Sequence, residues 1–257
     1  MKTSVRTFAV CVTAFTMAAV IPTRVAFAAE NGALLDRLFD GKITATQRIN
    51  ACFELRGKAD AETIRAMSRA LDDPDLLACA ADNLRIASAV EALQHALSND
   101  NPQVRAAAAR QLGSFEKPEL LEALSIAARD QNALVATNAL AGLSQYREPV
   151  VVPYLAGLAK MGGMIGDMAI ERLAQLDSGG ALSIARDLIG SSQIPDKLYA
   201  MRVMGSFGDA SDLPGLEKIA ASDSENLTRH DRGFGLMPPI NLSRAAKAAM
   251  ASIESRN

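Results

Sequence analysis

Apolar residues recur along this chain in pairs four positions apart, with a small residue first and a large one second. A spacing of four places both members of a pair on one face of a helix. Successive small members lie 29, 28, 31, 30, 31 and finally 46 positions apart. The pairs are Ala51 with Leu55, Ala80 with Leu84, Ala108 with Leu112, Ala139 with Leu143, Ala169 with Leu173, Ala200 with Met204, and Ala246 with Met250. This pattern predicts seven equivalent helices, one in each repeat.

A second apolar helix is predicted after each of these helices except the last. Its central residue follows the large member of the pair by nine positions in the first two repeats and by twelve in the next four. These residues are Ile64, Leu93, Leu124, Leu155, Ala185 and Leu216. One helix pair cannot bury its apolar face alone, so neighbouring pairs must stack. We therefore expect an all-α fold, an α-solenoid of about seven helical repeats with the last incomplete, and a capping helix over residues 31–40.

Local signals within the repeats agree with this organisation. Prolines stand at or near the predicted helix starts, where a missing N–H costs no hydrogen bond; they are Pro74, Pro102, Pro118, Pro149 and Pro195. The repeat pattern consists of an Asp/Asn-Pro start, a small-and-large helix that ends near Leu-Gly, and a second apolar helix. This pattern resembles HEAT repeats, especially the short repeats of phycobilin lyase-like proteins, and the resemblance covers about residues 43–254. The period is below the roughly 40 to 47 residues of longer HEAT units. Asp196 stands where other repeats have Val or Leu, which leaves that helix start undefined.

The first residues form a separate segment. Lys2 and Arg6 precede an apolar run over residues 8–21, and the small-x-small sequence Ala26-Phe27-Ala28 follows. This arrangement predicts a secretory signal peptide over residues 1–28 rather than a membrane anchor, because the run is too short to span a bilayer. The mature chain, residues 29–257, would be periplasmic or secreted.

Residue composition and net charge bear on the fold class and on the classes of partner. Aromatic residues make up only 4% of the chain and Trp is absent, which favours close-packed helices over a β-sandwich. Without residues 1–28 the chain has 24 basic and 29 acidic residues, a net charge of −5. A nucleic acid or an anionic membrane requires a basic face. We therefore expect neither as a partner.

Motifs that would support catalysis are scarce. The only histidines are His95 and His230, and the sequence contains no His-x-x-x-His or Cys-x-x-Cys pair, no phosphate-binding glycine loop and no nucleophile-elbow serine. Gly113-Ser114 and Gly205-Ser206 fall near predicted helix ends, where glycine commonly terminates a helix. We expect a protein that is not an enzyme and has no cofactor.

Methionines form two groups whose sulfur atoms suit Cu(I). One group contains Met161, Met164 and Met168, and the other contains Met201 and Met204. Because Met204 occupies the large core position of its repeat, we interpret these methionines as core residues rather than metal ligands. The glycines around Met161 and Met164 leave room for a site at the first group.

Two cysteines remain after cleavage, Cys52 and Cys79, and an even pair in an oxidising compartment favours a disulfide. They lie on the first helices of adjacent repeats, one residue after Ala51 and one before Ala80. They therefore project to opposite flanks of equivalent helices and either face each other or face apart. A bridge and two buried thiols both remain open.

Two surfaces are candidates for binding. The HEAT resemblance implies that the second helices line a concave binding face; there Arg129, Lys160 and Arg186 form a weakly basic stripe near Tyr154. The long last interval places an insertion at about residues 223–241. Its charged and aromatic residues are further candidates for partner contact: Arg229, His230, Asp231, Arg232 and Phe234.

These observations favour an exported, non-enzymatic scaffold or adaptor that binds a protein or peptide. Two alternatives stay open. The resemblance to phycobilin lyase-like proteins implies a cleft for a tetrapyrrole-like small molecule, and a rigid acidic solenoid could also act as a periplasmic inhibitor or immunity protein.

Overall fold

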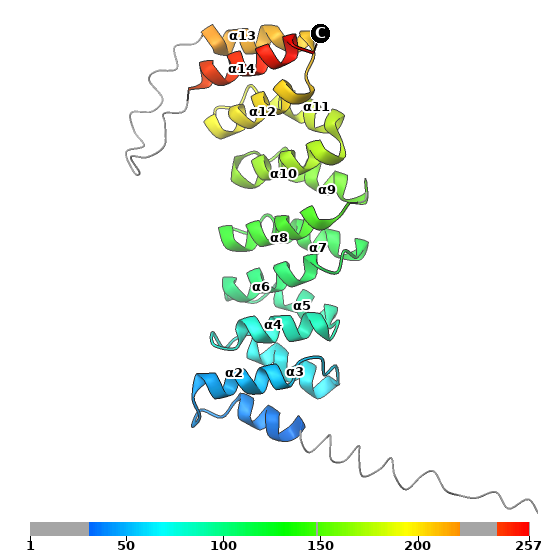
Figure 1. Ribbon diagram of the computed structural model, residues 1–257, viewed down its shortest axis with the longest axis vertical. Helices are drawn as coiled ribbons and strands as arrows, with labels where there is room; N and C mark the ends of the chain where they lie inside the picture. The colour runs from blue at the N-terminus through cyan, green and yellow to red at the C-terminus, as the bar shows by residue number, and fades with distance from the viewer. Residues whose placement is uncertain (1–30, 148, 222–240, 257) are drawn as a thin grey trace, which may run out of the picture. The chain divides into compact units, whose positions relative to one another are not determined.

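The computed structural model describes residues 31–147, 149–221 and 241–256 (Figure 1). These residues form helices joined by short turns, and no strand occurs among them. They divide into two compact units, one ending at Ala87 and one starting at Ser88. The all-α prediction is confirmed, and each unit consists of stacked helices as in an α-solenoid. The predicted signal peptide and nearly all of the predicted insertion lie outside the described residues.

The first unit consists of a helix over residues 31–38 followed by α2 (Ala45–Glu54), α3 (Ala61–Ala70) and α4 (Leu77–Ile86). The leading helix corresponds to the predicted capping helix and buries Leu34, Leu35 and Leu38. Thr44 begins α2 with a capping box: its side chain accepts from the Gln47 N–H, and the Gln47 side chain accepts from the Thr44 N–H. Such caps satisfy backbone donors that a helix start leaves free.

A disulfide joins Cys52 of α2 to Cys79 of α4, with the two Cα atoms 6.3 Å apart. The two sulfurs therefore face each other, which is the first of the two alternatives left open by the sequence. Asn83 lies against the bridge, and its Nδ2 donates to the Cys52 carbonyl oxygen at 2.9 Å. This unit thus joins its consecutive first helices through a covalent bond and a buried amide.

The second unit continues with α5 (Val90–Ala96) and four complete helix pairs. The first helices of these pairs stack in a row in Figure 1, and the single helix of the incomplete last repeat continues that row. The second helices lie beside them. The first helices are α6 (Pro102–Gly113), α8 (Ala133–Gln145), α10 (Gly163–Leu176), α12 (Ile194–Phe207) and α14 (Leu242–Glu254); the second helices are α7 (Leu121–Ala127), α9 (Val152–Ala159), α11 (Ser178–Leu188) and α13 (Leu213–Ala221). Short 3-10 turns precede three second helices: η1 (Pro118–Leu120), η2 (Pro149–Val151) and η3 (Ala210–Asp212).

The predicted small-and-large pairs form the core. All of their members are buried except Met250, which is half-buried. The nine-residue spacing predicted for the first repeat is wrong, because Ile64 is only half-buried and Met67 is the buried residue of α3. Met67 lies twelve positions after Leu55, so the first repeat has the same register as the later ones. The second repeat has buried residues at both spacings, Leu93 and Ala96.

Asp196 resolves the helix start that the sequence left undefined. Helix α12 begins at Ile194, with Pro195 in its first turn. Asp196 is buried, and its carboxylate accepts from the Gly163 N–H at 2.8 Å and from the Ser191 hydroxyl at 2.6 Å. An acid replaces Val or Leu at this position because it caps α10 in the preceding repeat.

Candidate functional site

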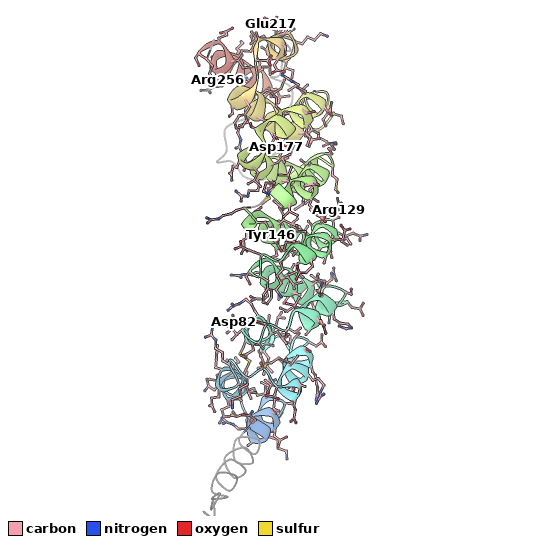
Figure 2. All side chains as sticks on the ribbon, turned by 90° about the vertical axis from the view of Figure 1, so that its right-hand side faces the viewer. Asp82, Arg129, Tyr146, Asp177, Glu217 and Arg256 are labelled. Carbon is pink, nitrogen blue, oxygen red and sulfur yellow. A yellow bond between two sulfur atoms is a disulfide. The ribbon has the colours of Figure 1, made fainter. Side chains whose placement is uncertain are left out.

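The predicted basic stripe spans three second helices. Arg129 lies in the turn after α7, Lys160 immediately follows α9, and both are exposed, with Arg129 at the surface in Figure 2. Tyr154 is half-buried within α9. Arg186 lies inside α11 rather than at its end, so it occupies a different register from Arg129 and Lys160. The three cations therefore do not occupy equivalent positions.

Arg186 is held by acidic residues. Its Nε donates to Asp212 Oδ1 at 2.7 Å, and its Nη2 donates to Asp212 Oδ2 at 3.1 Å and Asp209 Oδ2 at 3.2 Å. Asp212 is itself buried and belongs to η3. Hydrogen bonding and charge from these carboxylates raise the pKa of Arg186. This bidentate pair ties α11 to the next repeat, so the Arg186 guanidinium is already engaged.

Arg129 borders a hollow of about 640 Å³ on the surface of α5 and α7. Apolar and polar side chains both line it, and Ile126 of α7 is 62% exposed there. The lining residues are Gln94, Leu97, Ser98, Arg105, Ala123, Ile126, Ala127, Arg129, Asp130 and Gln131. Large apolar side chains that gather at a polar-rimmed depression are typical of contact sites.

The charges among the lining residues are partly compensated. Arg105 and Asp130 form a bidentate pair, with Nε to Oδ2 at 2.8 Å and Nη2 to Oδ1 at 3.0 Å. Hydrogen bonding to the Arg105 guanidinium holds the pKa of Asp130 below its usual range. Arg129 is the third charged residue among the lining residues, and it takes no part in this pair. The hollow therefore combines apolar side chains with one positive group.

Arg129 is held in place by its own helix. Its Nη1 donates to the Ser125 carbonyl oxygen at 2.9 Å and to the Ser125 hydroxyl at 2.7 Å. Its Nη2 lies over Gly157 of α9, where an added Cβ would come within 3.4 Å of it. A Cβ at this position would therefore just contact the guanidinium. The anchored side chain loses little conformational entropy when it binds a carboxylate, because part of its freedom is already removed.

Sequence reasoning found Arg129 but missed Leu97 and Ile126. Ile126 lies two positions after the buried Leu124, so it falls away from the apolar face that the repeat pattern defines. A large aliphatic residue off the core face was therefore a usable signal. Leu97 gave no such signal, because it ends α5 next to core positions. The structure does not include Tyr154, Lys160 or Arg186 in the lining of the hollow.

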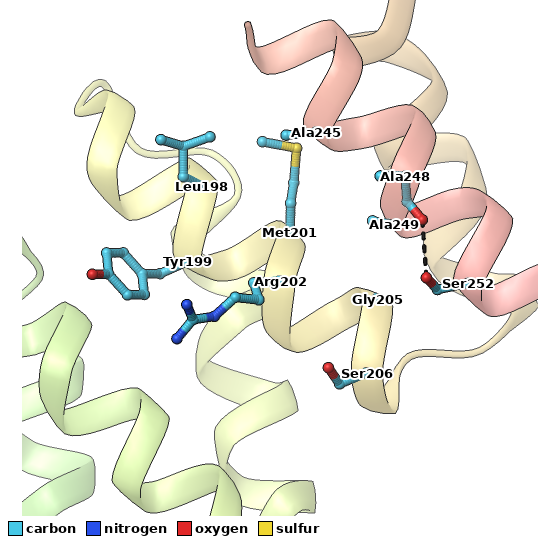
Figure 3. A pocket seen from close by; sticks show the side chains of 10 residues that line it. All are labelled: Leu198, Tyr199, Met201, Arg202, Gly205, Ser206, Ala245, Ala248, Ala249 and Ser252. Carbon is cyan, nitrogen blue, oxygen red and sulfur yellow. Dashed lines mark hydrogen bonds between the residues drawn. The ribbon is translucent and has the colours of Figure 1, made fainter. Parts of the chain in front are cut away.

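A second hollow of about 550 Å³ lies between α12 and α14 (Figure 3). Small residues of α14 and Gly205 of α12 line it, and Met201 points toward Ala245. Arg202 stacks over the Tyr199 ring at 5.2 Å from its centroid and pairs with Glu171. The Arg202 guanidinium in this hollow therefore already has an aromatic ring and a carboxylate as partners.

The two methionine groups differ in solvent exposure, which the sequence did not predict. Met201 and Met204 are buried, as expected for core residues. Met161, Met164 and Met168 are 56%, 55% and 38% exposed, so the core interpretation is wrong for this group. The three residues surround the start of α10, where the core face is formed by Ala169, Ile170 and Leu173 instead.

Within the part of the chain that the structure describes, few features indicate metal binding, membrane insertion or catalysis. No group of three His, Cys, Asp or Glu side chains there could hold a metal ion, and no helix there is long and apolar enough to cross a membrane. His95 is exposed on α5. Ser114 caps α6, and Ser206 lies in the last turn of α12. The predicted partner-binding residues of the insertion lie outside the described residues: Arg229, His230, Asp231, Arg232 and Phe234.

Comparisons with known proteins concern the repeat fold. No curated protein matches the chain. Human deoxyhypusine hydroxylase in complex with glycerol is similar in structure, with 18% sequence identity and a TM-score of 0.40 over 91% of this chain and 99% of that one. Escherichia coli YibA has 14% identity and a TM-score of 0.46 over 93% and 98% of the two chains. A designed armadillo repeat protein in complex with the peptide (KR)4 has 16% identity and a TM-score of 0.30 over 87% and 99%.

At these identities and TM-scores the similarity does not extend to activity or partners. The family comparison is more direct: the model of the HEAT repeats family matches residues 90–162, which cover α5 to α9 and the hollow beside Arg129. The predicted resemblance to HEAT repeats is thereby confirmed for residues 90–162.

Proposed function

We propose that the chain is a non-catalytic adaptor that binds an extended segment of a partner protein at the hollow on α5 and α7. One observation carries the proposal: the exposed Ile126 lies in the same depression as Arg129, whose charge no other lining residue balances. An apolar side chain of the partner would cover Ile126, and a neighbouring carboxylate would pair with the Arg129 guanidinium. The partner segment should therefore combine an aliphatic or aromatic residue with Asp or Glu.

Peptide selection tests this proposal even while the partner is unidentified. Random peptides displayed on phage would be selected against the mature chain, residues 29–257, and the enriched sequences measured by fluorescence polarisation. We expect enrichment of an apolar residue next to an acidic one. Ile126→Ser and Arg129→Gln should each weaken binding about tenfold or more, as expected for contacts at the centre of an interface.

Leu134→Ser provides the matched control, because Leu134 is a comparably exposed aliphatic residue, 54% exposed, at the start of α8 outside the hollow. The control should bind the selected peptides as the unaltered chain does. Peptides that bind equally well to the Ile126 and Arg129 variants would place the binding surface elsewhere. The insertion at residues 223–241 would then be the next candidate.

We further propose that the protein acts in the periplasm or outside the cell. The predicted signal peptide supports this, and so does the bridge between Cys52 and Cys79, since disulfides persist mainly in oxidising compartments. Protein purified from its native host should begin at Ala29 by intact-mass measurement. Thiol titration of this protein, denatured without reductant, should find no free thiol. A chain that retains Met1 or two free thiols would contradict export.

The tetrapyrrole and inhibitor alternatives stay predictions, since no specific contact in the described residues favours either of them.

A further inference from the structure

The methionines of the described residues fall into separate environments. Met67, Met201 and Met204 are buried, with at most 3% of their surface exposed, and Met250 is half-buried. Met161, Met164 and Met168 present 38% to 56% of their surface to solvent within eight residues of sequence. Isolated exposed apolar residues are common, but three thioethers in one short segment are a distinct chemical feature.

The three methionines are near one another along the backbone. Met164 and Met168 lie one turn apart on α10, and residues four apart on a helix have Cβ atoms about 5–6 Å apart. Only two residues separate Met161 from Met164, so their Cα atoms are at most about 11 Å apart. A methionine side chain has three rotatable bonds and adapts its sulfur position easily. All three sulfur atoms are therefore within reach of one common point at the start of α10.

The turn that carries Met161 is well defined. Gly162 and Gly163 both have positive φ, 67° and 64°, a conformation that favours glycine. The Gly163 N–H donates to the Asp196 carboxylate at 2.8 Å, which ties the turn to α12. Met161 is thus held next to the first turn of α10 by a constrained backbone.

The charges around this segment favour a cation. A helix start alone would repel one, because the exposed N–H groups give it a partial positive charge. Here the Asp196 carboxylate accepts from the first N–H of α10 and offsets that charge. Asp167, the neighbour of Met168, is also buried, and its Oδ1 has no hydrogen-bond partner. Lys160, which precedes Met161, and Lys197, which follows Asp196, are cations next to these residues in the sequence; Lys160 is exposed, so its ammonium group can turn toward solvent.

Thioether sulfur selects soft monovalent ions and is a poor ligand for Ca²⁺ or Mg²⁺, which require oxygen. We propose that Met161, Met164 and Met168 form a solvent-accessible thioether site for Cu(I), with Ag(I) as a redox-inert substitute. The proposal involves binding of the reduced ion without electron transfer. It does not depend on the peptide-binding function proposed above.

Metal titration of the mature chain tests the site. Cu(I) would be titrated anaerobically in competition with bicinchoninate, and Ag(I) by isothermal calorimetry. We expect one ion per chain. The double variant Met164→Leu with Met168→Leu should bind at least about 100-fold more weakly, while each single variant, including Met161→Leu, should lose about tenfold. Leucine nearly preserves volume and apolar character, so the fold should persist, which circular dichroism would verify.

Met204→Leu is the matched control, since it removes one buried thioether and should leave the affinity for Cu(I) unchanged. Full Cu(I) affinity in the double variant would overturn the proposal, as would failure of the unaltered chain to compete with bicinchoninate. Equal loss of affinity in the Met204 variant would also contradict the assigned position of the site.

Discussion

Helix α8 meets its two neighbouring first helices in different ways. Toward α6, Gly142 lies against Gly113 so closely that a Cβ at Gly113 would come within 3.0 Å of the Gly142 Cα. Toward α10, the equivalent repeat positions are Ser144 and Arg172. Arg172 donates from Nη2 to the Tyr146 carbonyl oxygen at 2.9 Å, but its Nε is buried without a partner. One junction is a direct backbone contact, and the other contains a long charged side chain.

A polar junction also joins α10 to the repeat that follows. Asp167 of α10 is buried and near enough to Asp196 of α12 for the two charges to interact. Buried polar groups contribute less net stability than apolar packing when some of their atoms lack partners. The junctions between successive repeats therefore differ in how much they stabilise the stack. We expect local opening to start around α10 rather than between α6 and α8.

The largest expected effect comes from filling the glycine contact. Gly113→Ala should lower the free energy of unfolding by about 3 kcal/mol, because the added methyl group meets backbone that cannot move aside easily. Urea unfolding followed by circular dichroism measures this. Gly215→Ala is the control, since nothing lies within 4 Å of a Cβ there and the change should stabilise α13 by up to about 1 kcal/mol. If Gly113→Ala had no effect, the close junction would not be the more firmly packed one.

A pH-dependent effect should appear at the polar junction. Burial, followed by the charge of Asp196, raises the pKa of Asp167 to about 6. Between about pH 4 and pH 6 the folded chain keeps a proton that the unfolded chain has lost, so stability falls as pH rises through this window. Asp167→Asn removes this penalty. The variant should be more stable than the unaltered chain by about 2 kcal/mol at pH 7.5, and the difference should disappear near pH 4.

Thermal unfolding between pH 4 and pH 8 checks this prediction. Asp187→Asn, at an exposed position of α11, is the control for removing a carboxylate from a helix. A difference between the Asp167 variant and the unaltered chain that stays constant from pH 4 to pH 8 would rule out titration of this group as the cause.

The smallest effect is expected at Arg172 of α10, the repeat position equivalent to Gly142 of α8. Arg172→Met keeps the apolar stem, loses the hydrogen bonds to Tyr146 and Gln175, and removes the unpartnered Nε. These terms oppose one another, so stability should change by less than about 1 kcal/mol. Urea unfolding would again be the measurement. A loss as large as that expected for Gly113→Ala would show that the guanidinium holds α8 and α10 together.

Much of the fold and part of the candidate site could be read from the sequence. The small-and-large pairs located the core of each first helix, because helical periodicity is a local property. The same approach misplaced the core of α3 at Ile64, since Met67 also fits a helical face and only packing decides between them. At the site, Arg129 followed from register and Ile126 had a signal in its position off the core face, whereas Leu97 could be identified only once the structure showed the lining of the hollow.

By itself, the sequence determined the helical repeat, the register of its first helices and the family resemblance, because each depends on residues within about 30 positions of one another. Only the tertiary structure decided that Asp196 caps a helix of the preceding repeat, that Arg186 is engaged by acidic residues, and that three methionines near α10 are exposed. These outcomes depend on which atoms of neighbouring repeats come within a few ångströms. Hydrogen bonding, desolvation and exposure are set at that distance, and a one-dimensional pattern does not contain it.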